Sequence, residues 1–331
     1  MGGYGYVIDP FDNYESVKNK TNCRTAKNAN DQFAVNCNQL YHGKIIDDKM
    51  INRKRMDSAT RCSVLVRLLG MLTTYICIPN LCHAHGPLHE QIIEVTRQIA
   101  MFPDSVELYL KRGELHRHHL DWPAALADIN RADSLRSDLS AIELYRGKTW
   151  LDAAEPERAK LALDVYLAKF PDDADGLMTR ARVLVLLGEH LPAAQDFTRA
   201  LVHLDTPQPE HYLERAQALC AGQHLAEALS GLDEGMQRLG TIVTLELYAI
   251  DLEIQQQHYE AALARLEKVA AQSPRKEKWL ARRGEILRMA GRYDQAQQAF
   301  RLALKEIESL PQARRHTKAT MELEKRLRAM L

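Results

Sequence analysis

Histidines are the side chains of this chain best suited to chemistry at neutral pH. His83, His85 and His89 form one group, and residues 116–119 hold three more. Neutral imidazole binds copper and zinc, and an amino terminus created just before His85 would add a second nitrogen ligand. A copper-binding accessory protein is therefore an alternative function for this chain. We predict no metal site and no cofactor, because exposed histidines are common and need no ligand.

Arginines recur at a nearly constant spacing and suggest a second kind of chemistry. A guanidinium group binds a phosphate or a carboxylate through two parallel hydrogen bonds, so a ladder of arginines is typical of an anion site. Aspartates recur in the following predicted helices, at Asp128 and Asp196, where they can pair with the arginines. We therefore favour structural ion pairs over an anion site. The recurring arginines are Arg112, Arg146, Arg180, Arg215 and Arg283.

The chain carries no sequence motif of an enzyme. It has no GxSxG nucleophile motif, no HExxH helix and no glycine-rich loop for phosphates. Five of its six cysteines precede residue 85 and form no CxxC pair, which argues against a zinc site, and Cys220 is a lone thiol. We predict that the chain is not an enzyme and has no small-molecule substrate.

The strongest pattern in the sequence is a helical repeat of about 34 residues. Small residues recur where the first helix of each copy must approach the second closely. In the second helices, an alanine is followed four residues later by a large apolar residue. The small residues of the first helices are Gly113, Gly147, Ala181, Ala216, Ala249 or Ile250, and Gly284. The second-helix residues are Ala125, Ala159, Ala193, Ala228, Ala262 and Ala296, with Ile129, Leu163, Phe197, Leu232, Leu266 and Phe300.

The clearest copy, residues 279–304, reads WLARRGEILRMAGRYDQAQQAFRLAL. It resembles the tetratricopeptide repeat (TPR), because the bulky residue, small residue, Gly, Tyr, Ala, Phe and Ala of the family pattern occur in the same order. The chain as a whole resembles the secreted bacterial members of that family. The resemblance covers residues 106–309. It implies an all-α fold, a right-handed superhelical solenoid of about six helix-turn-helix repeats with capping helices.

The segments outside the repeats have other predicted roles. Residues 1–55 are predicted to be disordered or to precede the true start at Met56. Residues 56–84 read as a signal peptide, because arginines precede the uncharged, mostly apolar residues 68–81 and a small-residue cleavage site. Residues 85–105 and 310–331 are predicted to form the N-terminal and C-terminal capping helices. The protein is therefore expected in the periplasm or outside the cell. The alternative is a membrane-tethered scaffold, in which residues 68–81 stay uncut.

The charge balance gives no support for a nucleic-acid partner. Lys plus Arg and Asp plus Glu each number 44, so no global basic field attracts phosphates. The family resemblance instead implies a non-enzymatic scaffold, an adaptor or assembly factor, that holds a protein or peptide in the concave groove of the solenoid. We expect the scaffold itself to be a monomer.

In the TPR family, ligand contacts come chiefly from the exposed face of the first helices. Carried onto this chain, that face combines an apolar row with charges of both signs and suits a helix or an extended segment with apolar anchors. The same apolar row could instead pack against adjacent repeats. The family's clamp for a C-terminal carboxylate is not matched at the first copy. The predicted groove residues are Leu110, Glu114, Arg117, Leu144, Lys148, Met178, Arg182, Val185, Leu213 and Gln217.

Overall fold

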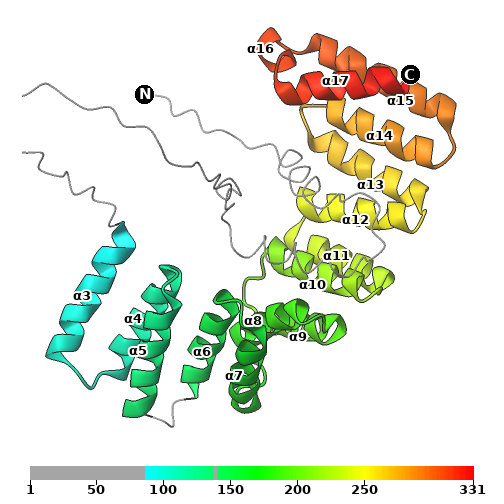
Figure 1. Cartoon of the computed structure of the whole chain (residues 1–331). Coiled ribbons are helices and arrows are strands. Elements are labelled where there is room, and N and C mark those ends of the chain that lie inside the picture. Colours follow the sequence, from blue (N-terminus) through cyan, green and yellow to red (C-terminus); the bar gives the residue numbers. More distant parts are fainter. Residues whose placement is uncertain (1–85, 137–139) are drawn as a thin grey trace, which may run out of the picture. The chain divides into compact units, whose positions relative to one another are not determined.

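The computed structural model describes residues 86–136 and 140–331, which form fifteen α-helices and no strand (Figure 1). This confirms the all-α prediction for the described part of the chain. The expected leader, the expected signal segment, and His83 and His85 lie outside the described residues. None of the described helices combines the length and the apolar character that a membrane span requires.

The described helices fall into two compact units, 86–162 and 163–331. The first unit contains α3 (Pro87–Met101), α4 (Val106–His118), α5 (Trp122–Leu135) and α6 (Ala141–Asp152). The boundary lies inside α7 (Pro156–Lys169). The second unit contains α8 (Ala174–Leu186), α9 (His190–His203), α10 (Pro209–Ala221), α11 (Leu225–Leu239), α12 (Val243–Gln255), α13 (Tyr259–Gln272), α14 (Glu277–Met289), α15 (Tyr293–Ser309), α16 (Gln312–Arg315) and α17 (Lys318–Met330).

The small residues of the repeat pattern lie where the two helices of a pair touch. Ala181, Ala216 and Ala249 are fully buried, and so are the alanines that begin the second-helix pattern in all but the last repeat. Gly284 shows the reason most directly: a Cβ atom there would lie 2.3 Å from Cε1 of Phe300. Close approach of two helix backbones therefore requires these small side chains, and large apolar residues such as Phe197 fill the space between them.

The turn between the two helices of each pair has the same backbone conformation in six repeats. Its residue has a positive φ, 76° at both Gly188 and Gly291, where glycine adopts the conformation without strain. The equivalent residues of the other four repeats are not glycine. They are Leu120, Ala154, Gln223 and Gln257, with φ between 57° and 67°. The geometry of the helix pair thus fixes this turn even where the residue type disfavours it.

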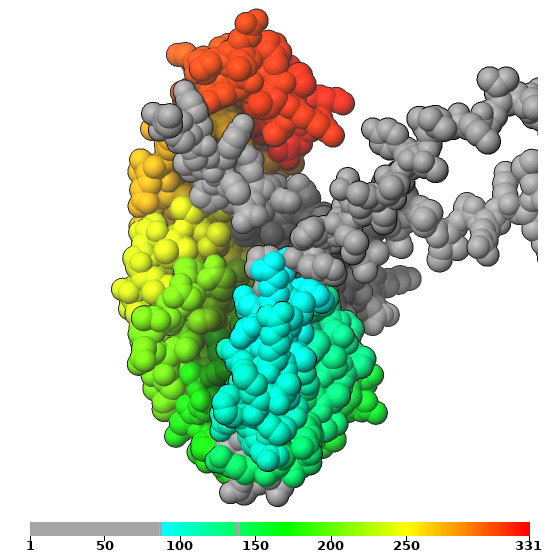
Figure 2. Space-filling model, turned by 90° about the vertical axis from the view of Figure 1, so that its left-hand side faces the viewer, coloured from blue at the N-terminus to red at the C-terminus, as the bar shows by residue number. Residues whose placement is uncertain are grey.

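Within each unit the helices pack in chain order, and an additional helix covers one end, α3 in the first unit and α17 in the second. Within residues 163–331, helices α8 to α15 contact their neighbours in chain order, as the surface in Figure 2 also shows from green through yellow to red. Helix α17 packs on α15, and its Leu323 and Leu327 join the core that contains Ile307. Leu302, also on α15, is 44% exposed and lies on the solvent side of that helix.

Candidate functional site

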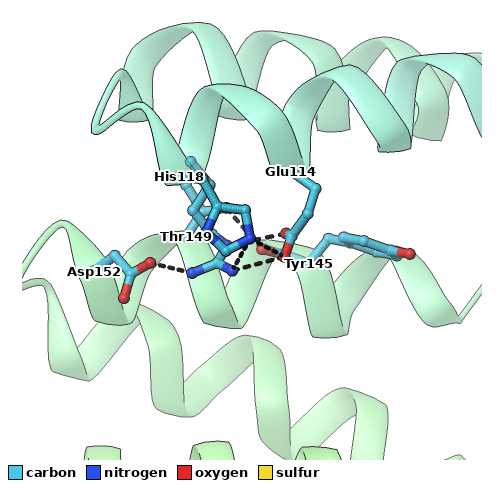
Figure 3. Close-up of polar contacts among 6 residues, drawn as sticks. Glu114, His118, Tyr145, Thr149 and Asp152 are labelled. Carbon is cyan, nitrogen blue, oxygen red and sulfur yellow. Dashed lines mark hydrogen bonds and ion pairs between the residues drawn. The ribbon is translucent and has the colours of Figure 1, made fainter. Parts of the chain in front are cut away.

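A cluster of charged side chains joins α4 to α6 in the first unit (Figure 3). Arg117 of α4 donates from Nη2 to Oε1 of Glu114 at 2.6 Å and forms a second ion pair, from Nη1, with Asp152 of α6. His118 extends the cluster, because its Nε2 lies 3.2 Å from the same Glu114 oxygen. The cluster connects the first helices of two consecutive repeats.

Burial and charge act in opposite directions on this cluster. Burial alone would raise the pKa of Glu114, but the hydrogen bond and the positive charge of Arg117 outweigh it, so the pKa of Glu114 is lowered. Burial would likewise lower the pKa of Arg117, but its hydrogen bonds and the charges of Glu114 and Asp152 raise it. Both groups therefore stay charged at neutral pH. The Arg117 side chain is only 14% exposed, and its charge is already matched by carboxylates of the protein.

Ion pairs of the same kind join first helices in residues 163–331. Arg182 of α8 donates from Nη2 to Oε2 of Glu214 of α10 at 3.1 Å. Arg282 of α14 pairs with Asp251 of α12 and, from Nη1 at 3.2 Å, with Glu285 of its own helix. We refer to the face of the first helices that carries these pairs, in either unit, as the first-helix wall.

Two of the predicted groove residues are buried, and this corrects the expected apolar row. Leu110 is 7% exposed and belongs to the core cluster that includes Val95 and Ile99 of α3, so α3 covers it. Met178 is 5% exposed and belongs to the interior as well. The alternative interpretation, packing between helices, therefore holds for these two residues.

The other predicted groove residues all keep part of their surface exposed on the first helices. A partly exposed apolar side chain beside a charged one is what an amphipathic partner segment would contact. No contact with a partner is part of the structure, so their binding role stays a prediction. These residues are Glu114, Arg117, Leu144, Lys148, Arg182, Val185, Leu213 and Gln217.

Two of the recurring arginines, Arg112 and Arg180, form the predicted structural ion pairs with Asp128 and Asp196. Arg112 donates from Nε and Nη2 to the two carboxylate oxygens of Asp128, at 2.8 and 2.6 Å. Arg180 binds Asp196 in the same bidentate way, at 2.7 and 3.0 Å. Each pair joins the two helices of one repeat. A guanidinium held in this way is not available for an anion from solution.

Sequence reasoning missed the acidic partners of the first-helix wall. Asp152, Glu214 and Asp251 face an arginine of a neighbouring repeat, and none of the three was among the predicted site residues. A signal was present in the sequence, because the partners are 31 to 35 residues apart, close to one repeat length. Opposite charges separated by one repeat on first helices therefore predict contacts between consecutive repeats.

The described residues do not support a metal site. Among them, no group of three or more His, Cys, Asp or Glu side chains is placed to hold a metal ion. The rings of His89 and His119 lie with centroids 6.4 Å apart, and His118 is engaged with Glu114. The copper alternative depends on His85, which lies outside the described part of the chain.

Comparison with known proteins gives one family match, at the C-terminal end of the repeat array, and several structures of similar fold. Residues 249–313 match the family model described as tetratricopeptide repeat. The C-terminal part of a TPR repeat-containing protein from Cytophaga hutchinsonii has a TM-score of 0.55 and 17% identity, covering 71% of this chain and 94% of that one. A tetratricopeptide repeat protein from Parabacteroides merdae has a TM-score of 0.45 and 19% identity, covering 74% and 93%. No curated protein matches. At these identities the likeness concerns the fold alone.

Proposed function

We propose that this chain, of which residues 249–313 match the tetratricopeptide repeat, holds a protein or peptide on the first-helix wall, as an adaptor or assembly factor that performs no chemistry. Helical repeats of this kind expose an extended surface that suits protein binding. The proposal concerns the wall of each unit by itself. We further propose that the scaffold is a monomer that acts outside the cytoplasm. N-terminal sequencing of the native protein tests its location: a start at or near His85 supports export, and a mature start upstream of Met56 contradicts it.

The observation that carries the proposal is the combination of arginines already paired with carboxylates of this chain and partly exposed apolar side chains. Arg117, Arg182 and Arg282 each already contact a carboxylate of this chain. A partner that depended on a free carboxylate would have to displace those groups. Leu213 and Val185 offer apolar contact beside the Arg182 pair. We therefore infer that the partner binds through apolar anchors in a helix or an extended segment.

The first experiment locates the partner on the protein before the partner is known. A photo-cross-linking amino acid is placed at Leu213 on the wall, or at Val202, which is 73% exposed on the second helix α9. The proposal predicts a discrete adduct in the native cell at position 213 and none at position 202. Mass spectrometry then identifies the adduct. Equal adducts at both positions, or an adduct only at position 202, would refute the wall as the binding surface.

The second experiment measures binding of the identified partner. The double variant Val185→Gln and Leu213→Gln removes apolar contact without adding charge, and we expect its affinity to fall by about tenfold or more. The matched control changes Leu161 and Val202 to Gln on outward-facing second helices, where the side chains are 69% and 73% exposed. Circular dichroism verifies that both variants stay folded. Met178→Glu is unsuitable, because a carboxylate at that buried position would destabilise the fold itself.

A further inference from the structure

A small cavity of about 260 Å³ lies between α13 and α14, away from the first-helix wall. Leu266, Trp279 and Leu280 form its apolar floor, while Lys276, Arg283 and Glu267 form a charged rim. Leu266 and Trp279 are 2% and 6% exposed, so the floor is part of the packed interior. The cavity therefore has a rigid apolar base under an ionic edge.

The cavity and the wall use different faces of α14. Lys276, Trp279, Leu280 and Arg283 follow the spacing i, i+3, i+4 and i+7, which places them on one side of the helix. The wall residues Arg282 and Glu285 fall about 140° around the axis from that side, at 100° per residue. A ligand in the cavity would not compete with a partner on the wall.

The size of the cavity favours a side chain over a whole small molecule. Pockets that enclose metabolites and cofactors measure about 300–1,000 Å³, and this cavity falls below that range. A single large apolar side chain would fill it and would lie against Trp279. The exposed Ala271 at the edge leaves the rest of a bound segment on the surface.

The rim charges favour an acidic ligand. Arg283 has Glu267 at 3.6 Å, and their side chains are 47% and 65% exposed. An exposed pair of this kind contributes little, so a carboxylate from a partner can replace it. Lys276 is exposed beside it.

The charge of the surrounding sequence also favours an acidic ligand at this cavity. Residues 275–331 contain fifteen Lys and Arg against seven Asp and Glu, a surplus of eight positive charges. Residues 86–274 contain eighteen against thirty, a surplus of twelve negative charges. Screening limits the direct reach of exposed charges to roughly 8 Å at physiological salt, so Lys276 and Arg283 at the rim act on a bound segment, and the rest of the surplus only favours the approach of an acidic partner.

We propose that this cavity is a second docking site, which takes one large apolar side chain from an acidic segment of a partner protein. The apolar side chain lies against Trp279, and flanking carboxylates pair with Lys276 and Arg283. A nucleic acid fits less well, because its phosphates gain nothing from an apolar floor and meet Glu267 at the rim. The site is independent of the first-helix wall and of any partner bound there.

The test selects peptide ligands from a random library, so the partner need not be identified first. Short random peptides displayed on phage are selected on the full chain and counter-selected on the double variant Lys276→Glu and Arg283→Glu. We expect the enriched peptides to carry a large apolar residue flanked by Asp or Glu. A synthetic copy of an enriched peptide should then lose affinity at least about tenfold on the rim variant, measured by fluorescence anisotropy.

Two controls separate this site from the rest of the protein. The variant Lys318→Glu and Lys325→Glu makes the same charge change on exposed positions of α17 and should alter peptide affinity by about twofold or less. The wall variant Val185→Gln and Leu213→Gln should leave peptide affinity unchanged. The proposal is wrong if no acidic-apolar peptides are enriched, if the α17 variant weakens binding equally, or if the wall variant abolishes it. It is also wrong if an oligonucleotide competes with the peptide, or if the rim proves to be where two copies of the chain associate.

Discussion

Gly284 is the position at which one added methyl group tests the packing of a repeat most directly. A Cβ atom at Gly284 would lie 2.3 Å from Cε1 and 2.5 Å from Cδ1 of Phe300. Carbon atoms in contact normally sit about 3.5–4.0 Å apart, so the ring must move by more than 1 Å. Phe300 is 1% exposed and is surrounded by the core of the last repeat. The variant Gly284→Ala therefore forces a rearrangement of the core.

Two opposing effects determine how much Gly284→Ala changes the free energy of unfolding. Overpacking a core costs about 1–3 kcal/mol, whereas Ala in place of Gly inside a helix is favourable by about 0.8–1.0 kcal/mol. The third repeat carries Ala181 opposite Phe197, so helix spacing can adapt to both groups. We therefore expect Gly284→Ala to lower the free energy of unfolding by about 1 kcal/mol.

The assay is thermal unfolding followed by circular dichroism, with Gly222→Ala as the matched control. Gly222 has a φ of −78°, and a Cβ there would meet its nearest atom at 3.4 Å. The control should gain about 0.4–1 kcal/mol, so the two midpoints should differ by about 3–8 °C for a unit of this size.

The double variant Gly284→Ala with Phe300→Leu should be less destabilised than the sum of its parts, because leucine occupies that position in other repeats and leaves room for the methyl group. Equal midpoints for the two glycine variants, or strict additivity in the double variant, would refute the assignment of Gly284 to a close helix contact.

Three further predictions concern the turns, a buried acid and the C-terminal end. Ala154→Gly should stabilise the protein by about 1 kcal/mol, because a non-glycine residue strains the left-handed conformation, and Gly188→Ala should destabilise it by a similar amount. If both variants shift the thermal unfolding midpoint in the same direction, this reasoning is wrong. Burial raises the pKa of Glu253, whose Oε2 has no hydrogen-bond partner among the described residues. The Glu253 carboxylate therefore takes up a proton more readily in the folded protein than in the unfolded chain. Wild type should gain stability relative to Glu253→Gln as pH falls from neutral toward 4.5. A difference in unfolding midpoint that is constant with pH would refute this. Deleting residues 317–331 should uncover Ile307 and promote aggregation, measurable by light scattering; unchanged solubility would show that α17 is dispensable.

The repeat itself was determined by the sequence, because it depends on local spacing. Small residues such as Ala181 and large ones such as Phe197 recur at fixed positions, and each helix pair reproduces the same contact. The ion pairs within a repeat followed for the same reason, since Arg112 and Asp128 belong to adjacent helices. Residues 1–85 remain outside this comparison, and their predicted roles stay predictions.

Only the tertiary structure decided which of the side chains predicted to be exposed are covered, and which charged side chains form ion pairs between repeats. The repeat spacing places Leu110 and Leu144 in one row. It could not show that α3 covers Leu110, whereas Leu144 stays partly exposed. Arg117 and Asp152 are distant in sequence, and their contact depends on how one repeat stacks on the next. The cavity over Trp279 arises in the same way, from the imperfect filling of the space between α13 and α14. Periodicity fixes the face of a helix, but the neighbour that lies against that face determines whether a side chain packs, pairs or remains open to a partner.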